Sequence, residues 1–163
     1  LGYDGFTKFD HDFIGKEALQ VMQGKVHRKK VTFAWNNDDV NKVMASMFAP
    51  PGENYKFIDL PLSNYASSSF DSILSGSKVV GASMFSGYSF NERKMLSLAF
   101  VEEQYAKVGT KLTLVWGEEG GGTKKTTVER HKQLELRVEV GPTPYGQQAR
   151  ETYHQGWRTA AVG

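Results

Sequence analysis

A strict alternation of apolar and charged residues near the end of the chain limits most tightly what it can fold into. Leucine and valine occupy positions 134, 136, 138 and 140, while Glu135, Arg137 and Glu139 stand between them. Successive side chains of a β-strand point to opposite sides of a sheet. The segment is therefore predicted to be a strand with one face in the core and a charged face in solvent.

Further strand-like runs lie upstream and point to a mainly β protein. Their apolar positions are Val31, Phe33 and Trp35; Val79 and Val80; Leu96, Leu98 and Phe100; and Leu112, Leu114 and Trp116. The segment from Gly117 to Thr123 holds four glycines and is predicted to be a hairpin loop, because glycine accepts positive φ. Strands at this spacing predict an antiparallel barrel or sandwich.

Helical spacing is confined to the first part of the chain. Ile14, Ala18, Val21 and Met22 would share one face of a short helix that stops at Gly24. A second helix is predicted to run to about Phe48, capped by Asp38 or Asp39. The stretch 49–76 is rich in proline and serine and is predicted to be loop with short extended pieces.

Composition excludes several classes of function. The 163 residues include no cysteine, which excludes a disulfide framework, a thiol nucleophile, a cysteine zinc site and an iron–sulfur cluster. There is no apolar run of about 18 residues for a membrane span, and no signal-peptide pattern. A formal charge of +2 is too small to predict a nucleic-acid partner.

No catalytic constellation emerges from the residues alone. The histidines show no metal-ligand spacing: they are His11, His27, His131 and His154. Asp10 and Asp12 flank His11 and could act as an acid–base pair, but they also suit solvated charges before a helix. The glycine loop ends in Thr123-Lys124, the wrong order for a phosphate loop. The stretch 86–89 is predicted to be a turn, not a nucleophile elbow.

The tail after residue 142 mixes aromatic and basic side chains and has two interpretations. Its aromatic members are Tyr145, Tyr153 and Trp157, and its basic members are Arg150, His154 and Arg158. They could stack on a planar ligand and hold a carboxylate, or dock on the core or on another domain. Docking is the preferred interpretation.

Several short motifs, in order, resemble the glycine-cleavage T-protein family of tetrahydrofolate-dependent aminomethyl- and methyltransferases. The first is DFIGKEAL at 12–19, followed by GSKVVG at 76–81. Ser86-Gly87 and Ser89, the apolar strand 96–101, GTKL at 109–112 and GPTPY at 141–145 continue the pattern. Phe85 and Phe90 depart from the family, which has Thr and Pro there. Segments near 114–118 and 128–131 look more like the branch that demethylates aromatic methyl ethers.

The resemblance implies a fold and a domain organisation. Residues 1–25 would be the tail of a folate-binding core domain, 26–145 a C-terminal β-barrel with an insertion at about 36–75, and 146–163 a C-terminal tail. The expected fold class is mainly β (α+β): a small antiparallel β-barrel preceded by a short helical segment. The first segment reads as the interior of a longer protein, so the helix at 14–22 is expected to be loosely held.

The resemblance also implies a function. The chain would be the C-terminal domain of a cytoplasmic enzyme that moves a methyl group from an ether, amine or sulfonium donor to tetrahydrofolate. Its partners would be the N-terminal folate-binding domain of the same polypeptide and the small-molecule donor, with no nucleic acid and no membrane. No catalytic or metal-binding residue is assigned, and the chain alone is expected to be inactive. Tyr145, Arg93 and Tyr88 are the predicted cofactor-binding rim. The alternative is a non-enzymatic β-barrel module that binds a partner.

Overall fold

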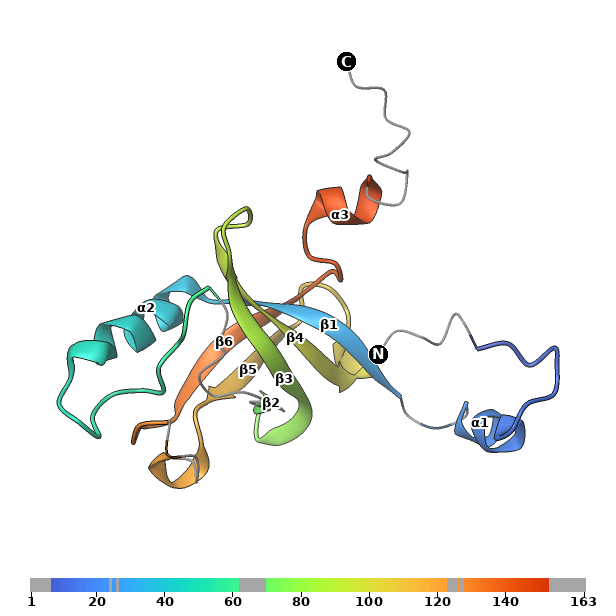
Figure 1. The fold of residues 1–163 in the computed structure, drawn as a ribbon, viewed down its shortest axis with the longest axis horizontal. Coiled ribbons are helices and arrows are strands. Elements are labelled where there is room, and N and C mark those ends of the chain that lie inside the picture. The colour runs from blue at the N-terminus through green and yellow to red at the C-terminus, as the bar shows by residue number, and fades with distance from the viewer. Residues whose placement is uncertain are drawn as a thin grey trace, which may run out of the picture.

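The main body of the chain is a closed antiparallel β-barrel (Figure 1). The computed structural model describes residues 7–23, 25, 27–61, 70–122, 126 and 128–152. Its strands are β1 (Arg28–Trp35), β2 (Asp71–Ser75), β3 (Lys78–Ser89), β4 (Lys94–Glu102), β5 (Lys111–Trp116) and β6 (Leu134–Gly141). The order around the barrel is β1-β4-β3-β2-β5-β6, and β1 pairs with both β4 and β6 to close it. The predicted fold class is confirmed.

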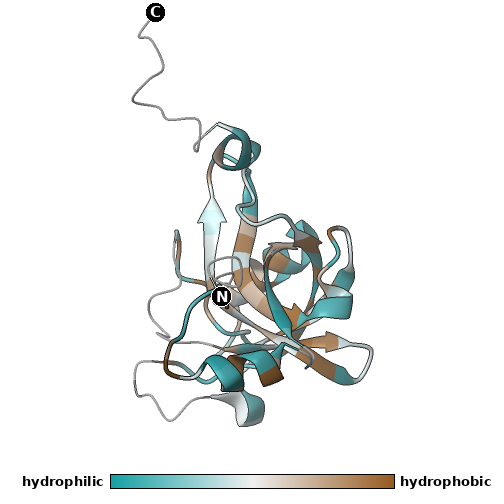
Figure 2. Cartoon of the chain, turned by 90° about the vertical axis from the view of Figure 1, so that its right-hand side faces the viewer, coloured by the Kyte–Doolittle hydropathy of each residue, from teal (hydrophilic) through white to brown (hydrophobic). Residues whose placement is uncertain are grey.

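The barrel interior is filled by the apolar faces that the alternation predicted for β1, β5 and β6. Phe33, Leu114 and Leu136 have no exposed surface. Trp35 and Trp116 pack edge to face with ring centroids 5.3 Å apart, a favourable aromatic geometry. The charged side chains of β6 point outward, as predicted. Apolar and polar residues alternate along the strand ribbons in Figure 2.

On β4 the alternation is present, but the larger apolar residues face outward. Leu96, Leu98 and Phe100 share one face as expected, yet the buried positions are Met95, Ser97, Ala99 and Val101. Ser97 can be buried because its hydroxyl accepts hydrogen bonds from Trp35 Nε1 at 3.0 Å and from Ser83 Oγ at 2.7 Å. The inward face of β4 thus carries the polar partner of a buried tryptophan.

Helices flank the barrel (Figure 1). The predicted first helix exists as α1 (Lys16–Met22), but Ile14 precedes it, no residue of α1 is buried, and Gly24 lies outside the described residues. The second is α2 (Asn37–Ala45), continued by the 3₁₀ turn η2 (Ser46–Phe48). Its cap is Asn36, not Asp38 or Asp39, because the Asn36 side chain accepts from the N–H groups of both aspartates. The remaining short elements are η3 (Glu103–Tyr105), η4 (Glu119–Gly121) and α3 (Gln147–Glu151).

Two segments were predicted to be irregular, and only the second prediction is wrong. The stretch 49–76 was predicted to be loop with short extended pieces, and the strand β2, which pairs with both β3 and β5, is such a piece. Residues 86–89, predicted to be a turn, belong to the end of β3, and the turn follows at 90–93. Short strands with many serines carry too little apolar periodicity to be recognised without their neighbours.

The glycine-rich connection between β5 and β6 is longer than a tight hairpin. It spans 117–133, and Gly117, Gly120 and Gly121 all adopt positive φ, as the glycine content indicated. No helix in the described part of the chain is long and apolar enough to cross a membrane.

Candidate ligand-binding rim beside the β3–β4 hairpin

The hairpin formed by β3 and β4 carries two of the predicted rim residues, Tyr88 and Arg93. Tyr88 pairs with Met95 across the hairpin, and Ser89 pairs with Lys94. The backbone N–H of Tyr88 also donates to the carbonyl of Pro61 at 2.7 Å. That bond ties the end of β3 to the segment that follows α2. The hairpin and α2 therefore form the two sides of one depression.

Tyr88 and Arg93 both line this depression, a pocket of about 300 Å³. Its floor is apolar and includes Val40, Met44, Ile58 and Met95, and its polar groups are Tyr88, Arg93, Asn37 and Asn41. An apolar cavity with a few convergent polar groups is the usual form of a small-molecule site. This volume suits one aromatic ring with a polar substituent.

Arg93 holds an unusual conformation. Its φ is +53°, although it is not glycine. Its guanidinium lies 4.8 Å from the centroid of the Phe90 ring, within the range of a cation–π contact. Both side chains are exposed, so the charged group remains available to a carboxylate.

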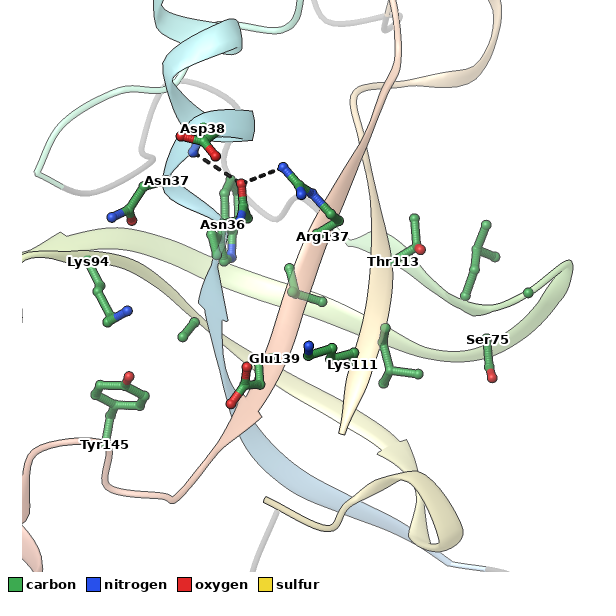
Figure 3. Close-up of a pocket in the computed structure, with 16 residues that line it drawn as sticks. Asn36, Asn37, Asp38, Ser75, Lys94, Lys111, Thr113, Arg137, Glu139 and Tyr145 are labelled. Carbon is green, nitrogen blue, oxygen red and sulfur yellow. Dashed lines mark hydrogen bonds between the residues drawn. The ribbon is translucent and has the colours of Figure 1, made fainter. Parts of the chain in front are cut away.

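The third predicted residue, Tyr145, lies in a separate depression of about 770 Å³ (Figure 3). Lys94 and Lys111 line the same trough, which Asn37 and Asp38 also border. The structure thus places Tyr145 apart from the Tyr88–Arg93 pocket, although Asn37 borders both.

The Tyr145 phenol keeps its proton. Partial burial raises the pKa of Tyr145, and the negative charges of Glu92 and Glu139 raise it further. Its ring packs against the backbone at Gly141, where a Cβ atom would lie 2.5 Å from Tyr145 Cε2. The residue is therefore a fixed hydrogen-bond donor at the edge of a lysine-lined trough.

An ion pair holds α2 against the barrel and so shapes the wall shared by both pockets. Asp39 accepts from Arg137 Nε at 2.8 Å and Nη2 at 2.9 Å, from the backbone N–H of Arg137 at 3.0 Å, and from Lys42 at 3.1 Å. The side-chain hydrogen bond from Arg137 is the main cause that holds the pKa of Asp39 well below its usual range. Arg137 Nη2 also donates to the Asn36 cap at 2.8 Å (Figure 3).

A buried ionic cluster that sequence reasoning missed lies at another part of the barrel. Lys56 is 1% exposed, with its Nζ 3.7 Å from Glu118 and 5.1 Å from the Trp116 ring centroid. Asp71 is buried beside it, and burial raises the pKa of Asp71 to about 6, although Lys56 and the Gly117 N–H oppose the shift. Both residues fall in the stretch predicted to be loop. A lone charge in such a stretch gives no signal that it will be buried.

The other sequence candidates have structural roles. His131 is buried, with Nε2 accepting from the Glu118 N–H at 2.9 Å and Nδ1 2.8 Å from the Glu129 carbonyl. Asp10, His11 and Asp12 are all exposed: Asp10 lies 2.8 Å from His11 Nδ1, whereas Asp12 pairs with Lys16 one helical turn on. Within the described ranges no group of three acidic or histidine side chains could hold a metal. His154 and the aromatic residues Tyr153 and Trp157 lie outside those ranges.

Comparison with known proteins adds two relatives. No family profile matches the chain. It is 47% identical over 159 residues to syringate O-demethylase from Sphingobium sp. (strain NBRC 103272 / SYK-6), an alignment that covers 98% of the chain and 34% of that enzyme. It is 36% identical over 154 residues to sesamin methylene transferase from Sinomonas sp. (strain No.22), covering 89% of the chain and 32% of the relative. The chain spans about a third of the length of each.

Proposed function

We propose that this chain is the barrel domain of an enzyme that transfers a one-carbon group from an aromatic ether to tetrahydrofolate. The observation that carries the proposal is the 47% identity to syringate O-demethylase over nearly the whole chain. The name of the second relative, a methylene transferase, also describes transfer of a one-carbon group. The T-protein-like motifs add tetrahydrofolate as the acceptor.

The residues on the rim fit part of a folate, not all of it. A pocket of about 300 Å³ can hold one ring of a molecule that contains two ring systems and a glutamate. Tyr88 and the apolar floor would contact such a ring, and Arg93 would bind a carboxylate. Tetrahydrofolate, when bound, supplies the nitrogen that accepts the carbon.

The barrel's contribution would be positioning and exclusion of water. No histidine lines either described pocket, and we expect the chain's own residues to bind and orient. Tyr145, kept protonated, would donate a hydrogen bond at the edge of the second trough. The reacting groups would then come from the part of the enzyme that the relatives possess in addition to this third.

A chimera tests this function. The matching third of the Sphingobium enzyme is replaced by this chain, and demethylation of syringate is measured with and without added tetrahydrofolate. We expect turnover that requires tetrahydrofolate, with KM for tetrahydrofolate raised by Arg93→Ala and by Tyr145→Ala. Arg130→Ala is the matched control, since Arg130 is exposed and lines neither pocket. A folded chimera without activity would favour a non-enzymatic binding module, and product from the chain alone would refute a purely positioning role.

A further inference from the structure

The outer surface of the barrel has two different sides. Around β6 it carries the exposed charges of Glu135, Arg137 and Glu139. Around β4 and β3 it is mainly apolar. The cross-strand rows there, from β1 through β4 to β3, are Lys30–Phe100–Ala82, Thr32–Leu98–Met84 and Ala34–Leu96–Gly87. Thr32 is buried against Thr143, so the accessible part of these rows lies on β4 and β3. Leu98 at the centre is 38% exposed. A solvated sheet face normally carries polar residues, so this face is built to contact something.

A β-bulge adds an aromatic side chain to the same surface. The pairing between β3 and β4 shifts between Met84 and Ser86, which leaves Phe85 unpaired. Phe85 has φ of +48° and its side chain is 73% exposed. The left-handed region is unfavourable for a bulky residue. Bulges of this kind redirect a side chain, and here the redirected side chain is a phenylalanine in water.

The tip of the hairpin continues the pattern. Phe90 is 70% exposed and stacks with Arg93. Away from the tip, at the opposite end of β3, Val79 is 57% exposed. Among the described residues, Phe85 and Arg93 are the non-glycine positions with positive φ, and both lie on this hairpin. Strained backbone concentrates at functional sites. The tip projects beyond the barrel in Figure 1.

Helix α1, which directly precedes the barrel, also leaves its apolar side chains uncovered. Val21 is 68% exposed and Met22 48%, and Ile14 beside the helix is fully exposed. A helix of this length gains its stability from packing. The chain therefore has uncovered apolar surface on an element before the barrel and on the barrel itself. Each relative is about three times as long as the part of it that aligns with this chain.

We infer that the outer β3–β4 face, with Phe85 and Phe90 as anchors, docks onto the additional two-thirds of the polypeptide that the relatives possess. This rests on the proposed function and specifies how the barrel would meet the rest of the enzyme. Exposed aromatic residues with an arginine are typical interface anchors. The cationic groups at the edge, Lys30 and Lys94, favour a partner surface that is apolar at its centre and carries carboxylates at its rim.

Hydrogen exchange on the chimera and on the chain alone tests this inference. We expect amides of residues 85–93 to exchange at least tenfold more slowly in the chimera, with β6 amides unchanged. Phe85→Asn should remove that protection, since asparagine tolerates positive φ and keeps the bulge. Phe48→Asn is the matched control: Phe48 is 89% exposed but lies in η2, beyond the end of α2. Equal exchange in both proteins, or protection over β5 and β6 instead, would overturn the inference.

A second measurement needs only the chain. The uncovered face should bind the dye ANS. The double variant Phe85→Asn with Phe90→Asn should lower the ANS fluorescence at least twofold, and the control variant Phe48→Asn should lower it less than the double variant does. A chain that binds no dye contradicts the inference, and self-association abolished by Phe85→Asn would assign the face to a second copy instead. The two proposals fail separately. Protection without methyl transfer refutes only the proposed function, and methyl transfer with an unprotected hairpin refutes only the docking.

Discussion

Replacing Asp39 with alanine should reveal how much the ion pair between Asp39 on α2 and Arg137 on β6 contributes to the stability of the fold. Asp39 is 3% exposed and accepts hydrogen bonds from three atoms of Arg137. The substitution leaves the Arg137 backbone N–H without its acceptor, a loss of about 1–3 kcal/mol. The Arg137 side chain is 63% exposed, so water can replace much of its contact with the Asp39 carboxylate. The ion pair between the two side chains therefore adds at most about 1 kcal/mol.

The expected total is about 1–4 kcal/mol of unfolding free energy. In a chain of this size that corresponds to a melting temperature lowered by roughly 2–16 °C. Thermal unfolding followed by circular dichroism measures it. Asp38→Ala is the matched control, because Asp38 is the exposed neighbour in the same helical turn. We expect the control to change the melting temperature by about 2 °C or less.

The pH dependence provides the sharper test. The pKa of Asp39 is lowered on folding from its ordinary value of 3.8, so the folded state favours the carboxylate. The stabilisation is therefore complete above pH 3.8 and is lost as the pH falls through the lower folded pKa. The difference in unfolding free energy between wild type and Asp39→Ala should narrow only below pH 3.8. A gap that is absent at pH 7, or that stays constant down to pH 2, would refute the reasoning.

Further outcomes are expected elsewhere in the barrel. Asp71 has a raised folded pKa near 6, so its buried charge destabilises the fold by about 2–3 kcal/mol above pH 6 and by progressively less toward pH 3.8. Denaturant unfolding between pH 4 and 7 should show this slope in wild type, and Asp71→Asn should lose it; an identical slope in both would count against burial as its cause. Gly81→Ala should lower stability by about 3 kcal/mol or more, because the new Cβ would lie 2.1 Å from the Phe100 carbonyl oxygen. Gly76→Ala, with φ of +60° and open space around it, should cost about 1 kcal/mol, and similar losses for both glycines would contradict the packing argument.

Several features of the fold could be predicted from residues near each other in the chain. The two-residue period of β1, β5 and β6 predicted strands, and it placed their apolar side chains in the core. The polar run after Trp35 predicted a helix start, although the capping side chain is that of Asn36. These signals are local because strand and helix periods express which side of one element meets water.

The sequence named candidate site residues but not how they lie relative to one another. Tyr88 and Arg93 lie together in one pocket, while Tyr145 borders another. No sequence pattern gave their distances, since the hairpin, α2 and the tail meet only after the barrel closes. The ionic cluster of Lys56 and Asp71 was not anticipated for the same reason, because its burial depends on strands far apart in the chain.

The sequence by itself determined that the chain is mainly β with strands of alternating character, that cysteine chemistry is excluded, and that its motifs resemble those of folate-dependent transferases, a resemblance that implied the barrel. The tertiary structure alone decided which side of β4 faces inward, and hence that Leu96, Leu98 and Phe100 face out. Period two is the same for either orientation of a strand. The inward side of β4 carries Ser97, which accepts a hydrogen bond from Trp35, a residue 62 positions away along the chain, and such a contact exists only in the folded barrel. The outward apolar face that results is the surface that we infer to dock onto the additional two-thirds of the polypeptide that the relatives possess.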